Sequence, residues 1–507
     1  MKRRSTPDVP RCALVLLPQQ IFRSFADDGT RDLLKAGAAC TLFHTETDCF
    51  LGSRDAHSAQ IELAPDEPRS TAIWQILYQD EKHGAAIRWD GVYRIRHVAT
   101  GHFLSVQRSR SAGGSREISL VDGRHADELE MLFRFEPQYA LTGKITTLQF
   151  MRIRHDSADG VVSYLCDGVL AGAETQAPGG QRSLLQLTQK QPEADVFAVR
   201  LFSHETFADL KYVINSTAPF TRFAEAAKAL SADAFAAASR LYTSGDAKTA
   251  DSPTMSRDFA HPLQMRGITN TVAELIRFVT KSDNLDPFTR EGMPIESRQL
   301  MLSELGVLKL AIDCVEAPFA AGLYTQEDVS TAKKLGSAIL EHQRLGKLAM
   351  RLVRHILRGQ STNKLATIPL VPELLGQLTV GWGASECLTE LFTDNEMVDR
   401  VPDETIMMFV DLIRTKGRLA KYIRFLEVLC ASRGKAVRVN QWRVARMLLE
   451  ESPDLLLQLH LQYDGKIIIS GDAQNFPKLA EAGGELELCQ WLDTTEKETA
   501  EYFQALS

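Results

Sequence analysis

Five basic side chains recur at intervals of three and four residues in the second half of the chain: Arg344, Lys347, Arg351, Arg354 and Arg358. In a helix this spacing places them along one face, opposite a run of leucine and isoleucine. Only Glu341 is near enough in sequence to offset the first of them, so we expect mutual repulsion along the rest. Guanidinium groups pair well with carboxylates, which makes this face a candidate docking surface for an acidic partner or for another part of the same assembly. The alternative is a solvated face, because charges at helical spacing are usual on exposed helices.

Three histidines, His44, His97 and His155, stand 53 and 58 residues apart, each at the end of a segment with strand-like alternation. Histidine is a common metal ligand, but none of the three has an Asp, Cys or His partner at ligand spacing in the sequence. We therefore expect the histidines to pack structurally near strand ends, and we predict no metal site.

Several classes of function lack a sequence signal. We find no Gly-rich phosphate loop, nucleophile elbow or His-Glu-x-x-His motif, so we predict no catalytic residue, no cofactor and no enzyme activity. The net charge of -7 over 507 residues argues against a nucleic-acid partner. Eight scattered cysteines without close pairs favour a reducing cytosol. No apolar run reaches the roughly 18 to 20 residues that cross a bilayer, so we expect no membrane span within this chain.

One pattern occurs three times in the first two hundred residues. Each copy has an alternating strand that ends in histidine, a turn, and an aromatic-aliphatic pair that opens the next strand. The copies are Cys40–His44 before Phe50 and Leu51, Tyr93–His97 before Phe103 and Leu104, and Met151–His155 before Tyr164 and Leu165. Three copies of an all-β unit of ~40 to 60 residues favour a pseudo-threefold barrel. We predict a β-trefoil over residues 20–205, preceded by an entry segment or domain remnant over 1–19.

After about residue 205, apolar residues recur at helical spacing. The expected helices are Phe220–Tyr242, Met265–Thr280, Glu296–Val315, Ala332–Leu357, Glu404–Ile413, Leu419–Ala431 and Asn440–Glu450. Amphipathic helices of middling length with short breaks are typical of stacked helical repeats, so we predict an all-α, armadillo-like domain over 206–465. A linker and the start of a further helical region are expected over 466–507. Ser282–Pro294, rich in turn-forming residues, is expected to be a mobile loop.

Specific segments carry a family resemblance. Ile87–Leu104, in which Arg-Ile-Arg-His is followed by Thr-Gly and Phe-Leu, resembles the MIR module of the inositol trisphosphate and ryanodine receptors. Protein O-mannosyltransferases share that module, so a glycosyltransferase-associated MIR protein is one alternative. Glu296–Leu308 and Phe425–Gln441 resemble the RIH domain of the same receptors. The order MIR then RIH, over roughly residues 12–460, makes the chain similar to the amino-terminal region of these calcium-release channels. Ala436–Gln441 looks more like the ryanodine branch, and Trp491–Glu498 more like the inositol trisphosphate branch.

The resemblance implies a ligand site of converging basic side chains for inositol trisphosphate. Carried over position by position, the remaining cations are Arg69 on a trefoil loop, Arg298 on a helix, and Lys364. The loop around Arg69 is acidic, and three other positions hold no cation where ligand-binding receptors place one: Glu296, Leu300 and Ser303. Each lost phosphate contact costs on the order of 1.5 to 3 kcal/mol of binding free energy. We therefore expect the site to be degenerate, and binding of inositol trisphosphate to be doubtful.

The function that the resemblance implies is that of a ligand-sensing, regulatory region of an intracellular calcium-release channel. Such a region would lie at the cytosolic face of the endoplasmic reticulum or of a related calcium-store membrane. Its partners would be other domains or subunits of the same channel, tetrameric in full length. The alternative is a stand-alone soluble scaffold that keeps the MIR and RIH domains in order to bind other proteins.

Overall fold

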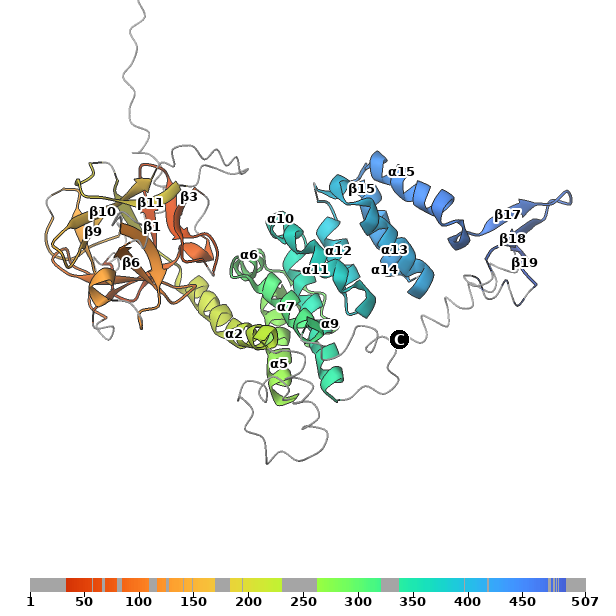
Figure 1. Ribbon diagram of the computed structural model, residues 1–507, viewed down its shortest axis with the longest axis horizontal. Coiled ribbons are helices and arrows are strands. Elements are labelled where there is room, and N and C mark those ends of the chain that lie inside the picture. The colour runs from red at the N-terminus through yellow and green to blue at the C-terminus, as the bar shows by residue number, and fades with distance from the viewer. Residues whose placement is uncertain are drawn as a thin grey trace, which may run out of the picture. The chain divides into compact units, whose positions relative to one another are not determined.

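The computed structural model describes residues 33–56, 58–65, 69–79, 84–108, 116–124, 127–139, 141–147, 149–168, 183–193, 195–229, 262–320, 337–395, 397–416, 419–472, 476, 479, 481 and 483–488. The chain divides into two compact units: residues 1–218 with 301–307, and residues 219–300 with 308–507. Strands dominate the first unit and helices the second (Figure 1). The expected entry segment, residues 1–19, lies outside the described residues.

A closed ring of strands forms the framework of the first unit. Its members are β1 (Ala39–His44), β4 (Trp74–Tyr78), β5 (Tyr93–His97), β8 (Phe133–Pro137), β9 (Phe150–Asp156) and β12 (Phe197–Leu201). Each strand pairs antiparallel with the next in this order, and β12 pairs with β1 to close the ring. Closure removes the exposed hydrogen-bonding edge that an open sheet would present.

The other strands that the structure describes in this unit form three hairpins. These are β2 (Cys49–Ser53) with β3 (Ile61–Ala64), β6 (Phe103–Arg108) with β7 (Arg116–Val121), and β10 (Val162–Gly168) with β11 (Ser183–Thr188). Each hairpin follows one histidine-bearing ring strand across a turn. In each turn one residue has a left-handed backbone: Asp48 (φ 53°), Gly101 (φ 74°) and Gly160 (φ 80°). Such a φ suits glycine or aspartate, so turn chemistry agrees with the repeat pattern of the sequence.

The core of the first unit lies inside the ring, where the inward residues of each strand are buried. Tyr93 and Ile95 on β5 alternate with half-buried arginines, as a half-buried strand requires. The three histidines are 0 to 1% exposed, and each packs with a tilted ring against the aromatic residue opposite it in the neighbouring strand. These pairs, with ring centroids 5.0, 4.9 and 5.5 Å apart, are His44–Phe197, His97–Trp74 and His155–Phe133. The three sequence copies therefore occupy corresponding places in the strand order.

Among the described residues, the α-helices follow the last ring strand. They are α2 (His204–Ala229), α5 (Pro262–Val279), α6 (Glu296–Glu304), α7 (Val307–Ala320), α9 (Ser337–Leu357), α10 (Ser361–Thr367), α11 (Val371–Gly376), α12 (Ala384–Phe392), α13 (Asp403–Lys416), α14 (Ala420–Cys430) and α15 (Arg438–Arg446). Pro219 lies inside α2, at the place in the sequence where the two units divide. Short strand pairs β13 (Thr280–Lys281) with β14 (Met293–Pro294), and β15 (Ala431–Ser432) with β16 (Lys435–Ala436), separate helices.

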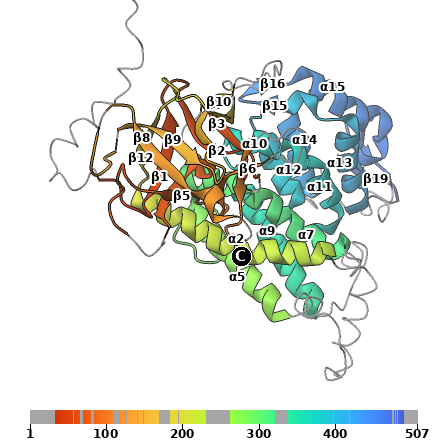
Figure 2. The ribbon, with the colours of Figure 1, turned by 60° about the vertical axis from the view of Figure 1, so that its left-hand side comes forward.

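Helix α9 is the central element of the second unit. It packs along α5 on one side and against α12 on the other, and α12 in turn packs against α14 (Figure 2). Its apolar face is 0 to 1% exposed at Leu345, Leu348, Leu352 and Ile356. Burying such a stripe against neighbouring helices supplies most of the stability of a helix of this kind.

The structure differs from the sequence expectation in several places. Helix α2 begins at His204, sixteen residues before the expected start at Phe220. The stretch expected as one helix over Glu296–Val315 is two helices, because Gly306 (φ 75°) breaks the helical path between α6 and α7. The short helices α10 to α12 were not expected. Where a linker and further helices were expected from residue 466, the described residues include β18 (Ile467–Ser470) and β19 (Glu485–Glu487), which form an antiparallel sheet with the preceding β17 (Gln458–Leu461). Within the described ranges, no helix is both long and apolar enough to cross a membrane.

Candidate functional site

The basic face of α9 consists of Arg344, Lys347, Arg351, Arg354 and Arg358, the last just beyond the helix end. Its two halves have different environments. Arg344 and Lys347 are exposed, whereas the side chains of Arg351, Arg354 and Arg358 are 17%, 31% and 38% exposed. The face is therefore solvated in its first half and covered in its second.

The cover is the loop between β13 and β14. Arg290 in this loop is 5% exposed and turns its guanidinium group inward. That group donates to Thr280 Oγ1 (2.6 Å) and to backbone oxygens of Thr280 (2.7 Å), Ser282 (2.9 Å) and Asn284 (2.5 Å). A buried arginine satisfied by carbonyl oxygens gives the loop a defined shape, instead of the mobile loop that composition alone favoured.

Glu291, the next residue, faces the second half of the basic face. Its Oε1 lies 2.8 Å from Arg351 Nη2 and 3.0 Å from Arg354 Nη1, and its Oε2 lies 3.6 Å from Arg358 Nη1. Arg351 also donates to the backbone oxygen of Arg290 at 2.7 Å, and Arg358 to that of Glu291 at 2.9 Å. One carboxylate and two backbone oxygens thus contact three guanidinium groups. We call this arrangement of Glu291 with Arg351, Arg354 and Arg358 the charge clamp between loop and helix.

The surroundings of the charge clamp lower the pKa values of Glu291 and of the neighbouring His355. Burial acts to raise the pKa of Glu291, but the positive charges of Arg354 and Arg351 outweigh it and the pKa is lowered. His355, whose Nε2 lies 3.0 Å from the Arg290 oxygen, has its pKa lowered to about 4 by burial first and by Arg351 second. At neutral pH the clamp therefore contains an ionised carboxylate and a neutral imidazole.

The sequence expectation of an unopposed basic face was wrong for its second half. Glu341 does not offset Arg344, because it pairs with Arg266 on α5 at 2.8 Å. Arg344 instead stands over the ring of Phe288, 5.5 Å from its centroid. The main compensating charge, Glu291, comes from a loop about sixty residues earlier in the chain, at a distance that sequence spacing cannot reveal.

Lys364, one of the three cations carried over from the ligand site, lies on α10 and is 5% exposed. Its ammonium group donates to the backbone oxygen of Thr393 at 2.7 Å and lies 3.4 Å from Glu390 Oε1. A lysine enclosed in this way uses its charge to hold α10 against α12. The same contacts leave little of its ammonium group open to a ligand.

The other two carried-over cations also have partners. Arg298 on α6 donates to the backbone oxygen of Phe278 at 3.0 Å, and its guanidinium group covers the ring of Phe278 at 4.3 Å. Arg69, in the first unit, lines a pocket of about 10 Å³ with Glu62. That volume is close to what a single water molecule requires. Arg298 and Lys364 belong to the second unit.

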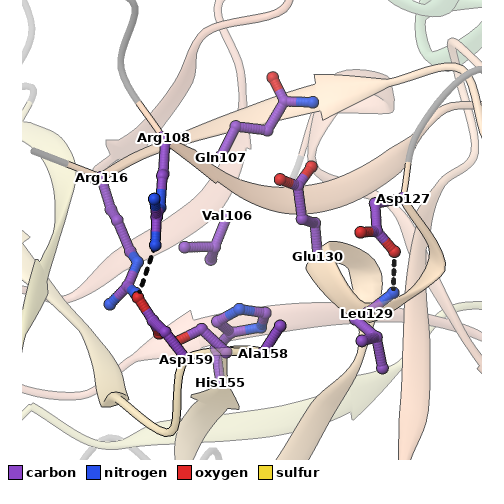
Figure 3. A pocket seen from close by; sticks show the side chains of 11 residues that line it. Val106, Gln107, Arg108, Arg116, Asp127, Leu129, Glu130, His155, Ala158 and Asp159 are labelled. Atoms are coloured by element: carbon purple, nitrogen blue, oxygen red, sulfur yellow. Dashed lines mark hydrogen bonds and ion pairs between the residues drawn. The ribbon is translucent and has the colours of Figure 1, made fainter. Parts of the chain in front are cut away.

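A pocket of about 310 Å³ in the first unit lies beside the β6–β7 hairpin (Figure 3). Arg108 and Arg116 point into it, and both contact Asp159, at 2.9 and 2.5 Å. Hydrogen bonds from Ser157 and Arg108 hold the pKa of Asp159 below its usual value. The lining carries three carboxylates against two guanidinium groups, so its charge does not favour a polyphosphate.

Comparison with known protein families matches both halves of the chain. A model of the MIR domain matches residues 32–165, and a model of the RIH domain matches residues 269–461. A protein of Dictyostelium discoideum called inositol 1,4,5-trisphosphate receptor-like protein A is 24% identical over 189 residues, which cover 37% of this chain and 5% of that protein. The inositol 1,4,5-trisphosphate receptor itr-1 of Caenorhabditis elegans is 21% identical over 526 residues, which cover 90% of this chain and 17% of that receptor.

These matches define a protein with an MIR domain followed by an RIH domain, which is the order predicted from the sequence. The chain is similar to the amino-terminal region of the inositol trisphosphate and ryanodine receptors. It spans less than a fifth of the length of either relative.

Proposed function

We propose that this chain is the regulatory amino-terminal region of an intracellular calcium-release channel, at the cytosolic face of a calcium-store membrane. The observation that carries the proposal is the match to a receptor over 90% of a chain that contains an MIR domain followed by an RIH domain. In this proposal the first unit is a β-trefoil, supported by its closed ring with three hairpins, and the second is an armadillo-like stack of helices.

The proposed region senses partners within the channel and has a degenerate site for inositol trisphosphate. Polyphosphate binding needs several cations that converge without being consumed by internal partners. Here Lys364 is bound to Thr393 and Glu390, Arg298 to Phe278, and the charge of Arg69 acts on the carboxylate of Glu304. These contacts support the loss of affinity that the substitutions Glu296, Leu300 and Ser303 already suggested.

The partner in this proposal is another domain or subunit of the same, tetrameric channel. Arg344 and Lys347 are the residues of the basic face that face solvent and lie outside the charge clamp. An acidic surface in the assembled channel is the complement that fits them.

Isothermal titration calorimetry with inositol trisphosphate tests the degenerate site. The 507-residue chain should give no binding heat at micromolar ligand, whereas the corresponding region of the Caenorhabditis elegans receptor serves as the positive control. A dissociation constant below about 1 μM, equivalent to roughly -8 kcal/mol, would overturn the degenerate-site proposal and show that other basic residues form the site.

A further inference from the structure

A cluster of possible metal ligands lies where the ring of the first unit closes. His44 at the end of β1, Glu46 in the following turn, and Asp195 just before β12 each offer one ligand atom, and these atoms all lie within 4.8 Å of one another. The His44 ring is fully buried, the Asp195 side chain is 22% exposed, and Glu46 is exposed. The cluster thus has the buried nitrogen of His44 at its inner end and the exposed carboxylate of Glu46 at its outer end.

The buried nitrogen is the observation that points to a ligand. His44 Nε2 has no hydrogen-bond partner among the described residues, although it is inaccessible to solvent. Its neighbour Asp195 Oδ1 is 3.3 Å away, longer than the usual 2.7 to 3.2 Å of an N–H···O bond. A buried polar atom without a hydrogen-bond partner is rare in folded proteins and calls for an unseen group.

The second sequence copy provides an internal comparison. His97 Nδ1 lies 3.0 Å from Thr100 Oγ1, just as His44 Nδ1 lies 2.9 Å from Thr47 Oγ1. On the other side of the ring the two differ, because His97 Nε2 pairs with the backbone oxygen of Thr71 at 2.9 Å. His44 meets carboxylates at the place where His97 meets a carbonyl.

The distance between His44 and Asp195 is one that two ligands of the same metal ion can have. A tetrahedral Zn²⁺ with bonds of about 2.0 to 2.1 Å places its ligand atoms about 3.3 to 3.4 Å apart. The distance between His44 Nε2 and Asp195 Oδ1 is 3.3 Å. A proton on Nδ1 would be donated to Thr47 Oγ1, which leaves the Nε2 lone pair directed at the cluster. Asp195 Oδ1 also accepts from the Asp167 backbone N–H at 3.0 Å, which fixes the carboxylate.

We propose that His44, Glu46 and Asp195 bind a divalent transition-metal ion of the zinc class, with the fourth position open to water. One imidazole nitrogen with two carboxylates suits Zn²⁺ or Co²⁺, whereas Ca²⁺ and Mg²⁺ prefer oxygen ligands alone. The two carboxylates balance the charge of the ion. The inference does not depend on the calcium-channel proposal.

The site would join the first and last strands of the ring. Thr45 already contacts Val196 through its backbone N–H (3.0 Å) and its hydroxyl (3.1 Å), so a bound metal would reinforce an existing seam. Because the ligands come together only in the folded unit, metal binding should stabilise the folded form by mass action.

The test uses the 507-residue chain without a polyhistidine tag, stripped by a chelator and titrated with Co²⁺ and Zn²⁺. We expect one Co²⁺ site with the visible spectrum of nitrogen and oxygen ligands, and a higher melting temperature of the first unit with Zn²⁺. Asp195→Asn and Glu46→Gln should each weaken binding at least about tenfold. Glu46 is an exposed turn residue, so its variant separates ligand loss from misfolding.

Cys166→Ser is the matched control. The Cys166 thiol is close enough to be influenced by Asp195, and burial, Asp195 and Asp167 raise its pKa to about 11. Binding should persist in this variant with an unchanged spectrum. Absence of Co²⁺ binding, wild-type affinity in both carboxylate variants, or loss of binding in Cys166→Ser alone would each overturn the proposal.

Discussion

Glu291 bears the charge that lets three arginines of the basic face lie close together at the end of α9. Like charges at helical spacing repel by a few tenths of a kcal/mol per pair, and the carboxylate at 2.8 to 3.6 Å offsets that repulsion. The Glu291 side chain is 48% exposed, so solvent screens each pair and the value of the whole clamp remains modest.

Glu291→Gln should reduce the stability of the second unit by up to about 1 kcal/mol at low salt. The reason is that Gln keeps the size of the side chain and removes the charge that faces Arg351 and Arg354. Urea unfolding at low and at high salt measures the difference, which should shrink with salt. Glu427→Gln is the matched control, because the Glu427–Arg424 pair is 61% exposed on both sides and should matter little.

The pH dependence of the same variant has a defined sign. The pKa of Glu291 is lowered in the folded protein, so its contribution is fully present above the ordinary glutamate pKa, about 4.3, and is lost as pH falls through the lowered value. Wild type and Glu291→Gln should therefore differ at pH 7 and converge in acid. A difference that persists unchanged at low pH would contradict the charge clamp.

Lys364→Met should destabilise the second unit by about 2 to 3 kcal/mol, since it leaves Glu390 and the Thr393 carbonyl without their cation. This loss of stability lies at or below the lower end of the range for removing one partner of a buried ion pair, because the Glu390 side chain is 18% exposed. Thermal unfolding without any ligand measures the effect. A fully stable variant would show that Lys364 has no structural role and would reopen a role in ligand binding.

The sequence could predict contacts between residues that are close together in the chain, but not contacts between residues that are far apart. The five cations of the basic face were identified because helical spacing is local. Their partner Glu291 could not be identified, since it lies 60 residues before Arg351. Asp195, about 150 residues after His44, was missed for the same reason, and the expectation that no metal site exists rested on sequence spacing alone.

At the scale of elements, α9 depends on a close approach to Trp382, which is 4% exposed. A Cβ on Gly346 would lie 2.2 Å from Cε3 of that indole, far inside contact distance. Gly346→Ala should therefore destabilise the second unit, because overpacking costs about 1 to 3 kcal/mol and outweighs the gain of roughly 1 kcal/mol from alanine in a helix.

Gly267→Ala on α5 is the matched control, since a Cβ there would meet nothing within 4 Å. It should raise stability by about 0.5 to 1 kcal/mol. Opposite signs for the two substitutions in thermal unfolding would agree with the packing of α9. A stabilising Gly346→Ala would show that Trp382 does not press on that helix.

Elements with strong periodicity were predictable and short ones were not. Alternation around Arg-Ile-Arg-His identified β5 and β9, and helical spacing over Ala332–Leu357 identified α9. Helices α10 and α11 contain seven and six residues, too few for a helical period to stand out. The break at Gly306 depends on a left-handed backbone that a single glycine only suggests.

At the scale of the whole molecule, the basic face divides into an internal half and a half available to partners. Reversing both Arg344 and Lys347 to Glu should weaken association in the full-length protein in a salt-dependent way, with stability changed by less than about 0.5 kcal/mol. The same reversal at Arg351 and Arg354 should destabilise the second unit, because Glu291 would then face two carboxylates. Unchanged association of the first variant at low salt would make the exposed half merely solvated.

The most direct test of the proposed function is calcium flux through the full-length polypeptide. The protein is purified in detergent, reconstituted into vesicles loaded with Ca²⁺, and followed with a Ca²⁺-sensitive dye. We predict Ca²⁺ release that inositol trisphosphate does not alter, in keeping with a channel whose ligand site is degenerate. A full-length polypeptide that remains soluble without detergent and releases no Ca²⁺ would contradict the account and favour a scaffold that binds other proteins.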